Sequence, residues 1–447
     1  MASSGAARLS DIVTAWTENR SLKGEDAYAT SCDDRLMKGS YGVFDSHGGK
    51  EAGTICADQL IKKLLSITQT PRSGSDAFPL SMVDEEFWAV DKHLGANGVM
   101  SGTTASVLMV AASAKGPLVP TLNCKLAWVG DSTACVVDMT ADTMEPVHRT
   151  SDHNPSNAKE TQRMEWEWQV RAELRAIAAE KREAEAARDD IKDDDSFRLL
   201  VKGEDHGELS KDSFYAKSRA PTLEEVREAV KAMDLAGLDE RDLQTLVRAL
   251  GREKRIEAPE KRKSLSSPPG KPMLTRANSS IIKRVSENDP SVHGPTVLAG
   301  GSSHNGSKHG VVNVCVTRSI GDWDGARAMI PQPDVLTFEV QPSSHMRVII
   351  CSDGVWDMMT LEEACKITRR ASTAKAAAQS IVEKAYNRGM AKFERLKDDT
   401  TCVFASALCL IVPARSLLRA PVQIAYFDVC RLSCLAPRPR QVHGRRY

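Results

Sequence analysis

Acidic residues recur at the ends of apolar, strand-like runs, and these carboxylates are the residues best placed to do chemistry. Asp45 follows the run YGVF, Asp131 follows LAWVG, and Asp353 follows VIICS. Two acidic pairs stand in comparable places: Glu25-Asp26 and Asp398-Asp399. Carboxylates that meet at one rim of a sheet repel one another in surroundings of low dielectric constant, and divalent cations usually neutralise them. All-oxygen ligands of this kind suit Mg²⁺ or Mn²⁺ rather than Zn²⁺.

His47 stands two residues after Asp45 and directly before Gly48-Gly49. A single histidine is most often a surface or capping residue, and a single Asp-Gly step is most often a turn. The recurrence of acids at strand ends is much harder to explain by turns alone. Beside a metal site, His47 becomes a candidate proton donor.

The elements that must position these residues lie in two outer parts of the chain. Short apolar runs bounded by turn residues predict strands at 41–44, 107–111, 126–129, 311–316, 348–351 and 401–405. Helical spacing predicts helices at 58–66, 85–94, 361–370 and 374–391. A predicted strand that is followed by an acid would place that acid at the rim of a sheet.

The middle of the chain has a different character. No Gly or Pro occurs between Pro155 and Gly203, and apolar residues at 166, 170, 174 and 177 predict a long, mostly solvated helix. Thr222 and Glu225 form a capping box that starts a second helical pair. Residues 258–309 are rich in Ser, Pro, Gly and Lys, a composition typical of a disordered linker.

The chain therefore divides into four parts by sequence. The first part of a catalytic domain covers 1–165, and its second part covers 310–412. An insertion, helical and charged and then Ser/Pro-rich, covers 166–309, and a tail covers 413–447. We expect the insertion to be either a solvated spacer on the surface or a docking or regulatory element for a partner.

Composition excludes several classes of protein. The 60 Lys and Arg residues balance 60 Asp and Glu residues, so no net field draws the chain to nucleic acid or to a membrane surface. No apolar run approaches the ~20 residues that a membrane-spanning helix needs. The N-terminus shows no secretory signal, and the 11 scattered cysteines indicate a reduced environment. We therefore expect an intracellular protein, cytoplasmic and/or nuclear.

Residues 41–49 read YGVFDSHGG, and they resemble the FGVFDGHGG signature of the metal-dependent protein phosphatase 2C family. Further blocks follow in that family's order. They are SGTTA at 101–105, VGDS at 129–132, DHNP at 152–155, TRSIGD at 317–322, IPQP at 330–333, CSDGVWD at 351–357 and DDTT at 398–401. The resemblance implies an α+β fold, with two stacked, mainly antiparallel sheets flanked by helices.

The resemblance also implies roles for individual residues. Asp45 would bridge two Mg²⁺ or Mn²⁺ ions, Asp353 and Asp398 would bind one of them, and Glu25 with the Ser46 carbonyl would bind the other. Candidates for a third ion, or for support of these ligands, are Asp26, Asp131 and Asp357. His47 matches the family's general acid. Ser46 departs from the family, which has Gly there.

The family's phosphate-binding Arg usually lies four residues before the first acid of the Glu-Asp pair, a position held here by Ser21. Arg20 could serve after a small register shift, and Lys23 is the alternative.

These observations predict a serine/threonine protein phosphatase that acts on phosphoproteins. A hydroxide between two cations would attack phosphorus, and His47 would protonate the leaving oxygen. Two other functions stay open: a catalytically inactive phosphatase fold that serves as a scaffold, and an interaction protein built around the long helix of the insertion.

Overall fold

The computed structural model describes residues 9, 13–68, 77–99, 101–112, 121–167, 169–170, 173–174, 176–177, 221–233, 235, 238–252, 281–284, 296–300, 312–323, 329–341, 344–394 and 398–408. The predicted tail at 413–447 lies outside these residues. In the described part of the chain, no helix is long and apolar enough to cross a membrane.

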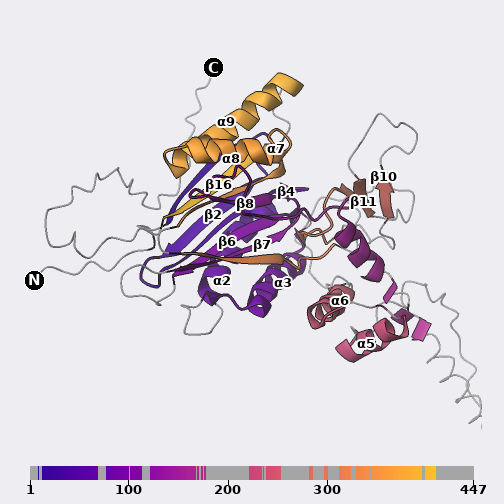
Figure 1. Ribbon diagram of the computed structural model, residues 1–447. Helices are drawn as coiled ribbons and strands as arrows, with labels where there is room; N and C mark the ends of the chain where they lie inside the picture. Colours follow the sequence, from indigo (N-terminus) through magenta and orange to yellow (C-terminus); the bar gives the residue numbers. More distant parts are fainter. Residues whose placement is uncertain are drawn as a thin grey trace, which may run out of the picture. The chain divides into compact units, whose positions relative to one another are not determined.

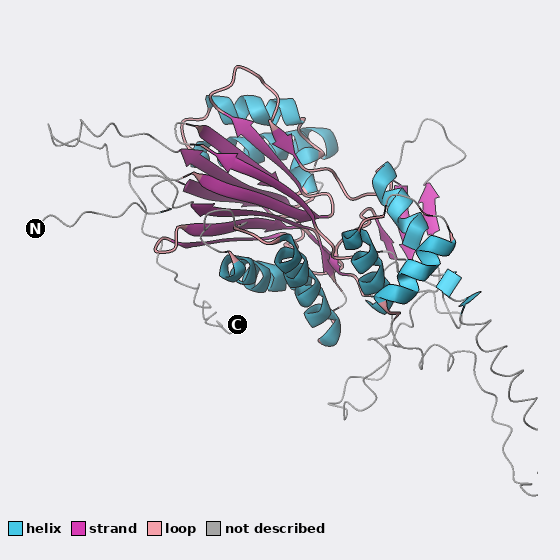
Figure 2. Cartoon of the chain, turned by 60° about the horizontal axis from the view of Figure 1, so that its bottom comes forward, coloured by secondary structure: helices cyan, strands magenta, loops and turns pink. Residues whose placement is uncertain are grey.

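Two five-stranded antiparallel sheets form the centre of the fold (Figures 1 and 2). In order, the first sheet contains β1 (Val13–Arg20), β16 (Thr400–Leu408), β15 (His345–Cys351), β8 (Thr133–Asp138) and β9 (His148–Arg149). The second contains β14 (Asp334–Val340), β7 (Leu122–Val129), β6 (Ala105–Ala112), β3 (Lys38–Phe44) and β2 (Ala27–Asp33). Strands from both outer parts of the sequence pair within each sheet, so the two parts form one domain.

Helices cover the outer face of each sheet. Helices α2 (Glu51–Ile67) and α3 (Leu80–Ala96) pack on the second sheet. Helices α7 (Asp353–Trp356), α8 (Leu361–Arg370) and α9 (Ala374–Phe393) pack on the first (Figure 1). The α+β fold class expected from the resemblance is confirmed.

The central strands are apolar on both faces because each face is covered. On β15, Val348 and Ile350 pack between the two sheets, whereas Ile349 packs toward α9. On β6, Leu108 points into the space between the sheets and Val107 packs against α2 and α3. Successive side chains of a strand point to opposite faces. This explains why these strands appear in the sequence as continuous apolar runs rather than as polar–apolar alternation.

Two small sheets complete the described strands. One joins β13 (Ile320–Gly321), β5 (Gly102–Thr103) and β4 (Ser46–His47). The other joins β10 (Ile281–Arg284), β11 (Thr296–Gly300) and β12 (Val312–Val314). Strands β10 and β11 fall within 258–309, so the prediction of a linker without regular structure is wrong at those residues. Backbone pairing with β12, beyond the linker, supplies the hydrogen bonds that composition does not reveal.

The insertion contains a helical pair, α5 (Leu223–Ala232) and α6 (Glu240–Arg252). The predicted capping box is confirmed, since Thr222 and Glu225 exchange hydrogen bonds at the start of α5. An apolar cluster joins Val226 of α5 and Leu246 of α6 to Val170. Of the long helix predicted after Pro155, residues 158–167 are helical without interruption, and residues 178–220 lie outside the described part.

The α6 helix returns to the catalytic domain and contacts it through Arg241. Its guanidinium donates to both carboxylate oxygens of Asp84 on α3, at 2.9 and 3.0 Å, and to the Pro333 carbonyl at 2.7 Å. Ala249 of the same helix packs in an apolar cluster with Trp88 and Ile330. A bidentate ion pair, the geometry that Arg forms best with carboxylates, therefore fixes this part of the insertion to the domain.

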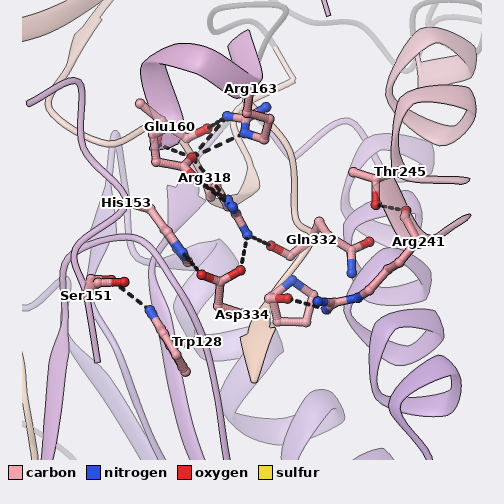
Figure 3. Close-up of polar contacts among 12 residues, drawn as sticks. Trp128, Ser151, His153, Glu160, Arg163, Arg241, Thr245, Arg318, Gln332 and Asp334 are labelled. Carbon is pink, nitrogen blue, oxygen red and sulfur yellow. Dashed lines mark hydrogen bonds and ion pairs between the residues drawn. The ribbon is translucent and has the colours of Figure 1, made fainter. Parts of the chain in front are cut away.

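A buried ion-pair network lies beside this contact (Figure 3). The Arg318 guanidinium donates to Glu160, to the Gln332 carbonyl at 3.0 Å and to Asp334 at 2.8 Å. Burial by itself would raise the pKa of the Glu160 carboxyl, but the cationic Arg163 and Arg318 hold it well below its usual range. The segment that begins at Thr317 is thus held to helix 158–167 by paired, largely buried charges.

We expect Arg318→Met to lower the free energy of unfolding by about 3–5 kcal/mol, because it removes the guanidinium that bonds both oxygens of the buried Glu160 carboxylate and also pairs with Asp334. Urea denaturation followed by circular dichroism measures this loss. The matched control is Arg227→Met, which removes an exposed ion pair with Glu240. If the two variants lose equal stability, the network is not the structural element described here.

Candidate active site

The strand register brings the predicted acids to one rim of the sandwich. In the first sheet, Cys351 at the end of β15 faces both Cys402 near the start of β16 and Thr133 at the start of β8. In the second sheet, Phe44 at the end of β3 faces Ala27 at the start of β2. The acids just beyond these strand ends are Glu25, Asp26, Asp45, Asp131, Asp353 and Asp398. Two links cross between the sheets at this rim, one after β1 and one after β7.

Asp399 holds the link that carries Glu25 and Asp26. One of its carboxylate oxygens accepts from the backbone N–H groups of Leu22 and Lys23, and the other accepts from those of Glu25 and Asp26. Burial alone would raise the pKa of Asp399, but these four backbone donors lower it. Asp399 is therefore an ionised anchor that fixes the backbone of two predicted metal ligands across the gap between β1 and β2.

The carboxyls at the rim perturb one another. Burial raises the pKa of Asp45 well above its usual value, and the nearby charges of Asp26, Asp353, Asp131 and Asp398 raise it further. Burial likewise raises the pKa of Asp26 to about 6, and burial with the charge of Asp353 raises the pKa of Asp131 to about 7. The mutual effect shows that these predicted site residues lie within electrostatic reach of one another.

Lys23 is the cation that contacts this rim. Its Nζ lies 2.8 Å from Asp398 Oδ2 and 4.0 Å from Glu25 Oε2. Burial alone would lower the pKa of Lys23, but its hydrogen bond to Asp398 and the surrounding carboxylates raise it. One ammonium group cannot balance the acids gathered here, so the rim retains excess negative charge.

The donor set of the rim fits Mg²⁺ or Mn²⁺. Every candidate ligand is an oxygen, as these hard cations prefer. Asp26 Oδ2 accepts from the Ser352 hydroxyl at 2.8 Å, whereas Asp26 Oδ1 is buried without a hydrogen-bond partner, which is a costly state for a carboxylate oxygen. Within the described residues, no three His, Cys, Asp or Glu side chains converge as a finished coordination sphere. The rim therefore fits these cations in the type of its donor atoms, in its charge and in its location.

Ser46 occupies β4, where its buried side chain has a structural task. Its hydroxyl accepts from the Gly53 N–H at 3.1 Å, near the start of α2, and lies 3.4 Å from the Thr103 hydroxyl. Ser46 is not among the described residues with positive φ, so the backbone there does not require glycine. The Ser in place of the family's Gly is thus accommodated without backbone strain, and its carbonyl remains the predicted ligand.

His47 lies next to Ser46, with its side chain 31 % exposed, and pairs with a residue that sequence reasoning did not single out. Its Nε2 lies 2.7 Å from Oδ2 of Asp322, whose side chain is only 4 % exposed. Burial alone would lower the pKa of His47, but the charge and hydrogen bond of Asp322 raise it above its ordinary value. The ring is therefore hydrogen-bonded to a carboxylate at the edge of the acidic rim, a contact that favours its protonated form.

The remaining predicted residues lie as follows. Arg20 ends β1 opposite Thr400; it is exposed, and within the described residues it makes no ion pair. Asp357 follows α7, and its N–H donates to the Asp353 carbonyl at 2.8 Å. The structure brings Lys23, rather than Arg20, into contact with the acids. Which of the two binds phosphate stays a prediction.

Comparisons with known proteins agree with the fold and the motifs. The family model for protein phosphatase 2C matches residues 13–167 and 283–392. Probable protein phosphatase 2C 5 of Arabidopsis thaliana is 38% identical over 108 residues, which cover 24% of this chain and 23% of that protein. Probable protein phosphatase 2C 69 of Oryza sativa subsp. japonica is 36% identical over 108 residues, with the same coverage. These alignments thus span about a quarter of the relatives' length.

A solved structure resembles the fold as a whole. The serine-threonine phosphatase 2C from Toxoplasma gondii superposes with a TM-score of 0.51 at 15% sequence identity, covering 88% of this chain and 94% of that one. The family model, the order of the motifs and this fold together place the chain in the protein phosphatase 2C family.

Sequence reasoning missed the roles of Asp399 and Asp322. A signal for Asp399 existed, since it adjoins Asp398 at the start of a strand, but the direction of its side chain toward backbone N–H groups left no trace in the sequence. Asp322 closes the TRSIGD block, yet its partner His47 lies 275 positions away. A two-residue strand pairing, too short to be recognised as a pattern, brings them together.

We expect Ser46→Gly to destabilise the protein by about 1–2 kcal/mol, from one lost buried hydrogen bond and the extra backbone freedom of Gly. Turnover should stay within about tenfold of the wild type, because the predicted ligand is the main-chain carbonyl. Urea denaturation and steady-state kinetics measure the two effects. A hundredfold loss of turnover in a stably folded variant would show that the hydroxyl itself takes part.

Removal of metal should make stability depend on pH. The folded-state pKa values of Asp26 and Asp131, about 6 and about 7, lie above their unfolded value near 3.9. Their stabilising contribution is therefore complete at acidic pH and is lost as the pH rises through these values. In EDTA the unfolding temperature should fall between about pH 4 and about pH 7 and change little above that, and MnCl₂ should raise it more at the higher pH.

The control for this prediction is Asp131→Asn, which removes one titrating carboxyl and should flatten the pH dependence in EDTA. An unfolding temperature that MnCl₂ leaves unchanged at both pH values would contradict metal binding at the rim.

Proposed function

We propose that this protein is a Mg²⁺- or Mn²⁺-dependent phosphatase that removes phosphate from phosphoserine and phosphothreonine in proteins. The single observation that carries the proposal is the set of carboxyls that the strand registers bring to one rim of the sandwich, with His47 bonded to Asp322 at its edge. Membership of a metal-dependent phosphatase family supports it. An acidic rim alone would repel a phosphate, so the reaction needs the cations that this donor set suits.

Five residues would hold two metal ions: Asp45, Asp353, Asp398, Glu25 and, through its carbonyl, Ser46. Asp398 and Glu25 lie beside Lys23, and the charges of Asp353 and Asp398 act on Asp45. Asp26, Asp131 and Asp357 are the candidates for a third ion or for support of these ligands. When bound, divalent ions supply an activated water nucleophile and offset the charge of the phosphoryl oxygens.

The chain's own residues perform the other tasks. His47 gives a proton to the leaving serine or threonine oxygen, which would otherwise depart as a strongly basic alkoxide; such protonation contributes about 10²–10⁴-fold. Lys23 or Arg20 orients the phosphate from the β1 side of the rim. Asp399 keeps Glu25 and Asp26 in place through its bonds to their backbone N–H groups.

Hydrolysis of a phosphothreonine peptide, with MnCl₂ and with EDTA, tests the proposal. We expect turnover only with the metal. Asp353→Asn should lower kcat by at least about 10³-fold, since several kcal/mol of transition-state stabilisation depend on the cations. The matched control is Asp58→Asn, an exposed acid on α2 that pairs with Lys62. Turnover in EDTA, or wild-type rates in Asp353→Asn, would overturn the proposed function.

A further inference from the structure

The small sheet of β4, β5 and β13 places His47 and Asp322 on opposite sides of a glycine. His47 pairs with Gly102 across one side of β5, and Gly321 pairs with Gly102 across the other. Asp322 directly follows Gly321. The middle position of this row carries no side chain, so the carboxylate can reach across it toward the imidazole.

The space over Gly102 is the space that Asp322 uses. A Cβ atom built on Gly102 would lie 2.0 Å from Asp322 Oδ2, far inside any permitted contact. Gly321 is equally constrained: its φ is +98°, and a Cβ there would lie 2.4 Å from the Ser101 carbonyl oxygen. Gly102 thus keeps open the path between the carboxylate and His47, and Gly321 allows β13 to approach the backbone of β5 closely.

Asp322 itself is held in an unfavourable backbone conformation. Its φ is +50°, a left-handed value that a residue with a side chain adopts only at some cost. The Ser319 hydroxyl donates to Asp322 Oδ2 at 2.5 Å, so the oxygen that meets His47 is fixed from a second direction. A buried carboxylate, held by a hydroxyl and aimed at one ring nitrogen, is an arrangement that orients a histidine.

We propose that Asp322 is the positioning residue for His47: it binds Nε2 of the ring and leaves Nδ1 as the nitrogen that gives the proton to the leaving oxygen. The proposal rests on the proposed function. As the P–O bond breaks, its electron pair stays on the serine or threonine oxygen, which takes the proton from Nδ1. The ring becomes neutral with its Nε2–H still bonded to Asp322, and solvent returns the proton to Nδ1.

The leaving group distinguishes this role from a structural one. A phosphothreonine peptide releases a strongly basic oxygen and needs the proton, whereas p-nitrophenyl phosphate releases a stable phenolate and does not. Asp322→Asn should therefore lower kcat on the peptide by at least about tenfold, with KM nearly unchanged, and should leave kcat on p-nitrophenyl phosphate within about threefold. Asp84→Asn, a buried acid that binds Arg241, is the matched control and should show no such selectivity.

Two further measurements make the test decisive. In a His47→Ala background, Asp322→Asn should not lower kcat on the peptide any further, because Asp322 acts through the imidazole ring of His47. Mn²⁺ affinity, measured by calorimetry, should match the wild type. If Asp322→Asn does not fold, Ser319→Ala, which removes only the supporting hydroxyl, should show the same selectivity in weaker form.

The outcomes separate the two proposals. A wild type that hydrolyses neither substrate with Mn²⁺ overturns the proposed function. An active wild type refutes the role of Asp322 if the variant loses both substrates equally, if its loss adds to that of His47→Ala, or if its Mn²⁺ affinity falls, since the last result would make Asp322 a ligand.

Discussion

Mutual repulsion among buried carboxylates is the constraint on which this structure depends. Burial raises the pKa values of Asp45, Asp26 and Asp131, and the charges of Asp26 and Asp131 raise that of Asp45 further. Left to itself, such a group would spread into solvent. The antiparallel registers of two sheets prevent this, because each acid directly adjoins a strand whose position is fixed by its neighbours. Apolar packing between the two sheets, and between each sheet and its helices, therefore holds together charges that would otherwise move apart.

Not every acid at the rim has the same task. Asp399 is ionised and satisfied by four backbone donors, so it has no oxygen to offer a cation and acts on the chain instead. Asp322 Oδ2 is likewise hydrogen-bonded, to the Ser319 hydroxyl and to His47. Asp26 retains a buried oxygen without a partner. Counting hydrogen bonds thus divides the acids into those that shape the site and those able to take a ligand.

The sequence predicted the parts of the fold that are strongly apolar or strongly periodic. Helix α8 spans the predicted 361–370, and α9 begins at the predicted residue 374. Of the longer strands in the two large sheets, β1, β2, β8 and β14 were not predicted. Three of them, β1, β2 and β14, are edge strands with one partner each. The β2 strand alternates exposed and half-buried residues without a large apolar side chain in its interior, so its pattern is faint.

The residues of the candidate site also include some that the sequence predicted and some that it did not. The acids were found because each adjoins an apolar strand, and His47 because it adjoins an acid. The pairing of His47 with Asp322 was not accessible, because it depends on a left-handed backbone at Asp322 and on the absence of a side chain at Gly102.

The order of strands in the first sheet has a consequence for the time at which the domain can form. Strands β1 and β8 come from the first 138 residues, yet they do not touch: β16 and β15, from the far end of the domain, lie between them. While the chain is being synthesised, β1 has no partner in its sheet, and β8 has only the two-residue strand β9, until residues 345–408 have appeared. Pairings this distant in sequence make folding slow. The acidic rim, which needs both sheets, is thus assembled only after translation of the whole domain, and a chain cut short within the insertion would contain every residue of its N-terminal half and no site.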